Sequence, residues 1–228
     1  MYDLDIPVPL WQSDGLSKTI AGRTRRVYDR LAAVYPVSTF LFHSQAHRYA
    51  LDISGIHDGM RVLEVAMGSG EMFRRLVNAN RNGATVGVDL SPNMAARAQK
   101  RARRAFGSAN TSFQAVDARH IPFRDESFDA VVCCYLLELL SPPDILQALA
   151  EFRRVLRGKG RLTLVSIGQN GRLFNRIYKV LGRIAPAFWG RQIDERLLAL
   201  IEASNFRVMK DRMVRQTFYP SRILAAQK

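Results

Sequence analysis

Cysteine is nearly absent from this sequence of 228 residues, which holds only Cys133 and Cys134. The two residues are adjacent and lie inside an apolar run, which argues against a structural disulfide and against a metal site. We therefore expect both to be small core residues of a strand, in a protein of the reducing cytoplasm.

Long hydrophobic runs are also lacking. No stretch approaches the ~20 apolar residues that a transmembrane helix needs. The first residues include Asp3, Asp5, Pro7 and Pro9 but no basic segment followed by an apolar core, so we expect no secretory signal. With 47% hydrophobic and 24% charged residues, the composition is typical of a globular chain, and the length suits one domain.

Acidic residues are scarce relative to basic ones. The chain has 34 Lys and Arg against 20 Asp and Glu, a net charge of +14 at pH 7. Such an excess favours polyanionic surroundings such as nucleic acid, anionic lipid or acidic substrates, and it is equally typical of a basic, solvated surface. Charge alone does not choose between these interpretations.

The region Arg61–Met94 has the most informative pattern. It predicts a buried strand (62–65), a glycine turn (68–70), a helix (71–78) and a second strand (85–88) that ends at Asp89. This order is typical of a nucleotide-binding βαβ half, and an acid about 20 residues beyond the glycines suits a ribose diol.

Two residues of this region argue against a dinucleotide. The dinucleotide fingerprint has a third glycine where this chain has Phe73. Glu71 stands at the start of the helix, where its carboxylate would repel a diphosphate but would tolerate a cationic ligand.

The same stretch resembles the E/D-x-G-x-G-x-G motif of class I S-adenosylmethionine (SAM)-dependent methyltransferases. The matching residues are Glu64-Val65-Ala66-Met67-Gly68-Ser69-Gly70, in which Ala66 replaces the first glycine. Two further stretches are similar to the branch that contains the quinone-biosynthesis C-methyltransferases and related lipid and small-molecule enzymes. They are Asp117-Ala118…Ile121-Pro122-Phe123…Ser127-Phe128-Asp129 and Leu156-Arg157-Gly158-Lys159-Gly160-Arg161-Leu162, the second matching an L-K-P-G-G-x-L turn.

The resemblance implies that SAM is the cofactor and assigns roles to residues. Ser69 and the backbone of Gly68–Gly70 would hold the methionine portion, Asp89 the ribose, and Asp117 with Ala118 the adenine. The full set of implied cofactor residues is Glu64, Ala66, Gly68, Ser69, Gly70, Asp89, Leu90, Met94, Asp117, Ala118 and Cys134. No catalytic residue and no metal ligand can be named.

The order of predicted elements indicates an α/β fold. Strands alternate with helices, and Ser91-Pro92 and Ser141-Pro142 are helix-start signals, each an N-cap followed by proline. With the resemblance, this predicts a Rossmann-like class I methyltransferase fold: a central, mostly parallel sheet with an antiparallel C-terminal strand and helices on both faces. N-terminal helices and a lid helix after strand five would complete it.

We expect one domain over residues 1–228, in four parts. Residues 1–16 would form a flexible arm, 17–53 N-terminal capping helices, 61–168 the SAM-binding core and 170–192 a lid or interfacial helix. Within the second part, we expect one helix to end at Tyr35, with Pro36 as its stop, and another to span Thr39–Ile53.

Substrate-binding candidates come from the parts that flank the core. Tyr28 and Tyr35 resemble a paired region that precedes the core of quinone methyltransferases, and Tyr135 follows strand four. The remaining candidates, Phe174 and Tyr178, lie in 170–190, where basic residues fall on one helical face and apolar ones opposite. This pattern predicts either an interfacial helix on anionic lipid or a lid packed on the domain.

The prediction is a cytoplasmic SAM-dependent methyltransferase with a small or lipophilic acceptor such as a quinol-type ring carbon. Peripheral contact with an anionic membrane at the inner face stays open. A phospholipid N-methyltransferase is the alternative within the enzyme class, and a non-catalytic SAM-binding or RNA-interacting protein is the alternative outside it. Nucleic acid is disfavoured because Cys133–Leu137 replaces the N/D-P-P-aromatic motif of nucleobase amine methyltransferases. The sequence predicts no oligomeric state.

Overall fold

A computed structural model describes residues 35–168, 193–216 and 220–228. The described elements follow in chain order: α2 (Tyr35–Ser54), β1 (Arg61–Val65), α3 (Glu71–Ala79), β2 (Ala84–Asp89), α4 (Pro92–Phe106), β3 (Thr111–Ala115), β4 (Phe128–Cys134), the short 3-10 helix η2 (Leu137–Leu139), α5 (Pro142–Val155), β5 (Leu156–Ile167), α8 (Asp194–Ala203), β6 (Arg207–Val214) and β7 (Ser221–Gln227).

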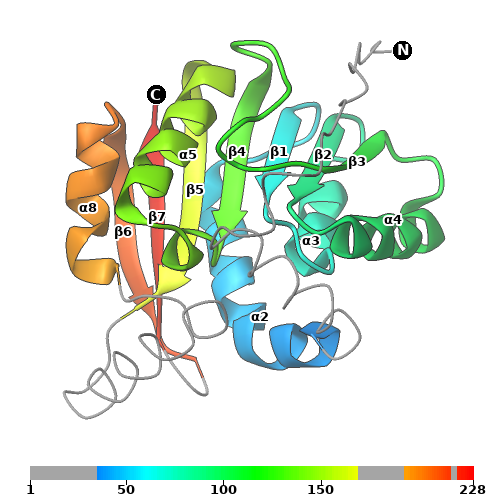
Figure 1. Ribbon diagram of the computed structural model, residues 1–228. Coiled ribbons are helices and arrows are strands. Elements are labelled where there is room, and N and C mark those ends of the chain that lie inside the picture. Colours follow the sequence, from blue (N-terminus) through cyan, green and yellow to red (C-terminus); the bar gives the residue numbers. More distant parts are fainter. Residues whose placement is uncertain (1–34, 169–192, 217–219) are drawn as a thin grey trace, which may run out of the picture.

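The strands form one sheet in the order β3-β2-β1-β4-β5-β7-β6 (Figure 1). The first five strands are parallel, whereas β7 runs antiparallel to both β5 and β6. The predicted α/β fold, with its mostly parallel sheet and antiparallel C-terminal strands, is confirmed. Since the order reverses between β1 and β4, this point at the carboxyl ends of the strands is where open α/β sheets bind ligands.

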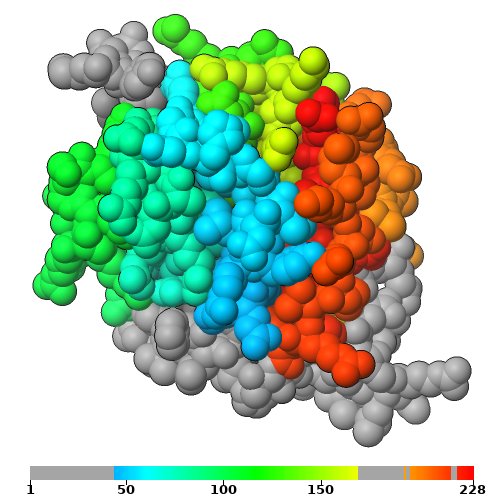
Figure 2. All heavy atoms as spheres, turned by 180° about the vertical axis from the view of Figure 1, so that it is seen from behind, coloured from blue at the N-terminus to red at the C-terminus, as the bar shows by residue number. Residues whose placement is uncertain are grey.

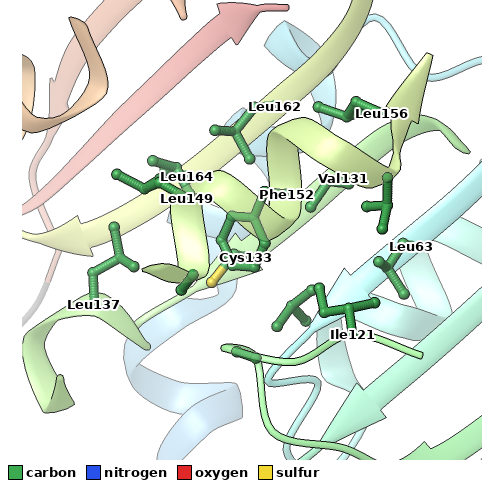
Figure 3. Close-up of a cluster of buried hydrophobic side chains, with 14 of the residues drawn as sticks. Leu63, Ile121, Val131, Cys133, Leu137, Leu149, Phe152, Leu156, Leu162 and Leu164 are labelled. Atoms are coloured by element: carbon green, nitrogen blue, oxygen red, sulfur yellow. The ribbon is translucent and has the colours of Figure 1, made fainter. Parts of the chain in front are cut away.

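Helices cover both faces of the sheet, and successive residues of β4 face opposite layers. Val131 and Cys133 join the core under α5 and α8, whereas Val132 and Cys134 join the core under α2 and α3. Figure 3 shows part of the first layer, where Phe152 of α5 lies among leucines of the neighbouring strands. The cysteines are free and buried, as the sequence predicts for core residues of a strand.

The back of the molecule shows the second layer. In Figure 2, α2 and α3 cover the middle of the sheet, and β6 lies beside α2 at one side. There the guanidinium of Arg212 from β6 lies 5.6 Å from the ring centre of Tyr49 of α2, a cation–π contact. Within the described residues, no helix is long and apolar enough to cross a bilayer.

The boundary between the N-terminal helices was predicted wrongly. Tyr35 begins α2 rather than ending an earlier helix, and Pro36 is the second residue of α2 rather than a stop. Proline is tolerated in a first turn because the N–H groups there have no partner within the helix. The predicted helix start at Thr39 is therefore four residues late.

The two predicted N-caps are confirmed. The hydroxyl of Ser91 accepts a hydrogen bond from the amide of Met94 at the start of α4. The hydroxyl of Ser141 accepts one from the amide of Asp144 at the start of α5. Both helices therefore begin at positions that local sequence chemistry determines.

Candidate functional site

A tight turn joins β1 to α3 at the carboxyl edge of the sheet. Ala66, Gly68 and Gly70 have φ angles of 59°, 53° and 83°, all in the left-handed region. The amide of Met67 donates to the carbonyl of Val88 (3.1 Å), and the amide of Gly70 donates to the carbonyl of Met67 (2.9 Å). The turn is thus fixed to the end of β2, and Ala66 holds a conformation that favours glycine.

Gly70 is required for more than its backbone angle. A Cβ atom at this position would lie 3.1 Å from the Cβ of Ala98 in α4. The absence of a side chain therefore lets the first turn of α3 pack closely against α4, and this packing holds the loop in place.

Asp89 ties together three segments at the end of β2. Its Oδ2 accepts a hydrogen bond from the amide of Gly68 (2.8 Å), and its Oδ1 accepts one from the amide of Ser91 (2.9 Å). Its carbonyl accepts from the amide of Val116 (2.8 Å), just after β3. The acid that the resemblance assigns to the ribose therefore also fixes the glycine turn and the entry to α4.

Two polar groups beside the turn are buried without a hydrogen-bond partner among the described residues. They are Oε2 of Glu64, in a residue 1% exposed, and Oγ of Ser69, in a residue 3% exposed. Burial raises the pKa of Glu64 well above its usual value, and the nearby charge of Asp89 raises it further. Unsatisfied buried groups are unfavourable, so a ligand that paired with them would gain by doing so.

Arg101 of α4 crosses to the turn. Its guanidinium donates to the carbonyl of Ser69 (3.1 Å) and pairs with Glu71 (3.4 Å), which Arg74 also approaches at 3.8 Å. The sequence did not predict this contact. Only the packing of α4 on α3 brings Arg101 to the turn.

Asp117 lies just beyond β3 and is 7% exposed. Burial alone would raise the pKa of its carboxyl group, but hydrogen bonds from the side chain and backbone of Arg119 outweigh burial and hold the pKa below its usual value. Ala118 beside it is 8% exposed. The two residues thus form a buried edge with an ionised carboxylate.

The carboxyl end of β4 forms the other side of the site. Cys134 is 9% exposed, and burial, followed by the charge of Glu64, raises the pKa of its thiol. Because a thiol must ionise to act as a nucleophile, the raised pKa disfavours a nucleophilic role for Cys134. The next residue, Tyr135, has a φ of 57°, a strained conformation for an aromatic residue.

The phenol of Tyr135 belongs to a hydrogen-bonded group. It lies 2.7 Å from the hydroxyl of Ser221, and the side-chain amide of Gln216 donates to both oxygens (3.3 and 2.6 Å). The ring of His47 from α2 lies 6.1 Å from the Tyr135 ring, centre to centre. This part-buried polar group joins α2, the end of β4, the segment after β6 and the start of β7, and the sequence predicted only its Tyr135.

Glu138 in η2 is buried and accepts a hydrogen bond from the amide of Ile167 (2.5 Å) at the end of β5. The contact fixes the loop after β4 to the neighbouring strand. Glu138 therefore has a structural role at the rim of the site.

Comparisons with known proteins agree with this geometry. Residues 62–160 match a family model described as "Methyltransferase domain". A ubiquinone/menaquinone biosynthesis C-methyltransferase UbiE of Cellvibrio japonicus is 28% identical over 182 residues, 76% of this chain and 71% of that protein. The UbiE of Pseudomonas savastanoi is 29% identical over 164 residues, 69% of this chain and 63% of that protein. The chain carries a SAM-dependent methyltransferase domain and resembles the quinone-biosynthesis branch of class I.

A solved structure extends the agreement to the fold. The magnesium protoporphyrin IX methyltransferase of Synechocystis, which contains bound SAH, superposes with a TM-score of 0.63 at 20% identity, covering 92% of this chain and 87% of the other. The present chain thus has the same fold as the Synechocystis enzyme. The match to the Pseudomonas relative spans less than two thirds of that relative's length.

The cofactor of the methyltransferase is SAM, and the residues at the turn fit it. SAM carries a sulfonium and an ammonium group, and Oε2 of Glu64, which has no partner among the described residues, is compatible with positive charge. Glu71, the acid at the start of α3, is already paired with Arg101 and Arg74. The left-handed turn follows β1, and the hydroxyl of Ser69 has no partner among the described residues. These carboxylate and hydroxyl oxygens suit a cationic nucleoside better than a diphosphate.

The structure does not describe all the predicted site residues. Tyr28, Phe174 and Tyr178 lie outside the described residues, and so does the side chain of Tyr35. Leu90 is partly buried between Asp89 and Ser91, whereas the side chain of Met94 is fully buried. The other predicted cofactor residues, together with Tyr135, lie along the carboxyl edge of β1, β2, β3 and β4 (Figure 1).

Proposed function

We propose that the methyltransferase transfers the methyl group of SAM to a ring carbon of a quinol-type acceptor. The observation that carries this proposal is the match to UbiE proteins over about three quarters of the chain. The match includes the motif at the first turn and the stretch from Asp117 to Asp129. The partly buried polar group around Tyr135 suits the oxygen of a ring substituent.

We assign the cofactor contacts as follows. The backbone of Gly68–Gly70 and the hydroxyl of Ser69 hold the methionine portion. Glu64 is the buried acid that lies closest in sequence to this turn. Asp89 accepts bonds from the ribose hydroxyls, and Asp117 and Ala118 contact the adenine. Support comes from the left-handed turn, the unpartnered oxygens and the ionised state of Asp117.

SAM supplies an electrophilic methyl group whose departure leaves a neutral thioether. The chain therefore has to position the acceptor in line with that group, and correct positioning can contribute several kcal/mol. Cys134 and Tyr135 are placed to do this because they follow β4, next to the turn of β1. The ring carbon loses its proton to solvent or to a base of the protein.

Transfer of an isotope-labelled methyl group tests the proposal. We expect label from SAM to appear on a demethylated isoprenoid quinol, at a ring carbon by mass spectrometry. Asp89→Asn should weaken SAM binding measured by titration calorimetry. SAM binding without label transfer to any quinol would contradict the acceptor, whereas absence of SAM binding would contradict the cofactor assignment.

Phospholipid N-methylation is the second candidate, because a net charge of +14 suits an anionic interface. The region 170–192, which the sequence predicts as a lid or interfacial helix, lies outside the described residues. The same assay with phosphatidylethanolamine vesicles separates the candidates. Label on the lipid amine, rather than on the quinol ring, would replace the first proposal with the second.

A further inference from the structure

Arg119 lies between two acids on different segments. Its guanidinium contacts both oxygens of Asp117 through Nε (3.0 and 3.2 Å) and Nη2 (2.6 Å), while Nη1 donates to Oδ1 of Asp144 (2.8 Å). The Arg119 side chain is 21% exposed, so this is a largely buried bridge. The flanking carboxylates raise the pKa of Arg119 above its usual value.

The hydrogen bonds of Asp117 can be counted. A carboxylate offers about four acceptor positions. Among the described residues, three donors reach them, all from Arg119: the backbone amide, at 3.0 Å from Oδ1, the Nε group shared by both oxygens, and Nη2. These three hydrogens make four contacts, two on each oxygen. Because the Nε hydrogen is shared, the carboxylate keeps capacity for about one further donor, which is what a single amine hydrogen requires.

The second half of the bridge fixes Arg119 itself. Oδ2 of Asp144 accepts a hydrogen bond from the hydroxyl of Ser141 (2.6 Å), which is the N-cap of α5. Arg119 therefore connects the end of β3 to the first turn of α5, the helix that follows the loop carrying Tyr135 and Glu138. The guanidinium has little freedom to leave Asp117, because planar, bidentate pairing holds its orientation.

We propose that Arg119 is a positioning residue for adenine recognition, holding the Asp117 carboxylate so that its one remaining acceptor position takes the exocyclic amine of the cofactor. The inference rests on the proposed contact between Asp117 and adenine. Arg119 does not touch the cofactor in this arrangement and acts only through Asp117.

Calorimetry with two ligands tests this role. The probes are S-adenosylhomocysteine and an analogue in which an unsubstituted purine replaces adenine, so that the amine is missing. For Arg119→Met we expect affinity for S-adenosylhomocysteine to fall about tenfold, as for loss of a charge-assisted hydrogen bond. Affinity for the purine analogue should change less than about twofold, because that ligand has no amine to orient.

Three variants make the comparison specific. Arg104→Met removes an exposed arginine from α4 and should leave both affinities unchanged. Arg119→Lys serves as a second variant if Arg119→Met folds poorly. It keeps the charge but not the bidentate geometry, so it should keep only part of the preference for S-adenosylhomocysteine over the purine analogue. Asp117→Asn should remove most of the preference for the amine.

Three different outcomes would overturn the proposal. If Asp117→Asn removes the preference but Arg119→Met lowers both affinities equally, Arg119 only supports the fold. If the unmodified protein binds both ligands equally well, Asp117 does not meet the amine and the proposed cofactor contact is wrong. Tighter binding of S-adenosylhomocysteine by Arg119→Met would show that Arg119 competes with the cofactor.

Discussion

Ala66 and Lys159 carry side chains where the backbone is left-handed, with φ angles of 59° and 65°. Both replace a glycine of a motif that the chain resembles, Ala66 in the cofactor turn and Lys159 near the start of β5. Left-handed backbone costs a residue with a Cβ atom about 1–2 kcal/mol, so the substitutions keep the turns at some expense of stability. The turn geometry therefore survives the loss of glycine because surrounding contacts impose it.

Ala66→Gly should stabilise the protein. Relief of the left-handed strain exceeds the entropy that glycine adds to the unfolded chain, so we expect a gain of about 0.5–1 kcal/mol in the free energy of unfolding in urea. Ala105→Gly, in the exposed and right-handed helix α4, is the matched control and should lose about 1 kcal/mol. A loss of similar size in both variants would mean that Ala66 is not strained.

Glu64→Gln should change how stability depends on pH. Because the folded pKa of Glu64 is raised, the folded protein retains a proton that the unfolded chain releases near 4.5. The stability that this group contributes is present below about pH 4.5 and is lost as the pH rises toward the folded value. The glutamine of the variant does not titrate, so its stability does not fall with pH in this way. At pH 7 its free energy of unfolding should therefore exceed that of the unmodified protein by roughly 1–2 kcal/mol.

Urea unfolding between pH 4 and pH 8 measures the difference, which should vanish at the acid end. The same variant should bind SAM more weakly, because the buried acid is retained for a cationic ligand rather than for stability. A constant difference across the pH range would show that Glu64 is ionised in the folded protein.

At the scale of elements, a glycine inside β2 leaves space for the turn that follows β1 and for α3. A Cβ atom on Gly87 would overlap the sulfur of Met67 and lie 2.8 Å from Cε2 of Phe73. Both side chains are buried, and Phe73 also packs on Phe113 at 4.7 Å between ring centres. The close approach of turn, α3 and β2 therefore depends on a glycine inside a strand.

Gly87→Ala should destabilise the protein by about 1–3 kcal/mol, since the extra methyl group has no space. It should also weaken SAM binding, because Met67 directly precedes Gly68. Gly158→Ala is the matched control: a Cβ atom there has nothing within 4 Å, and the change should stay within about 0.5 kcal/mol. Equal urea midpoints for the two variants would contradict the packing argument.

Local signals in the sequence predicted most of the elements but not their long-range contacts. Ser91 and Ser141 determine helix starts through bonds to residues three positions away, so the sequence alone could locate them. Pro36 was misplaced because proline both ends a helix and suits a first turn, and only tertiary packing decides between these roles. Arg119 was missed because its second partner lies 25 residues further along the chain.

At the scale of the whole molecule, positive charge gathers toward one edge of the sheet. Between Glu71 and Phe106 the chain has eight Lys and Arg but only two acids. Lys100, Arg103 and Arg104 are exposed on α4, which packs on β3, the edge strand opposite β6. Part of this charge suits the helix itself, because basic residues in a last turn interact favourably with the helix dipole.

A quinol acceptor dissolved in lipid would give this surface a function. Basic residues near an anionic bilayer contribute about 1 kcal/mol each, so neutralising three should weaken binding more than tenfold. We therefore expect the protein to sediment with anionic but not zwitterionic vesicles at low salt. Replacing Lys100, Arg103 and Arg104 with alanine should reduce that binding.

The matched control replaces Arg196, Arg207 and Lys210 with alanine. These three residues are exposed on α8 and β6, at the other edge of the sheet, and removing them changes the net charge equally. If the two triple variants lose binding equally, attraction depends on net charge and no particular face meets the bilayer. Equal sedimentation of the unmodified protein with both kinds of vesicle would remove the membrane from the proposal and leave a quinol delivered through solution or by another protein.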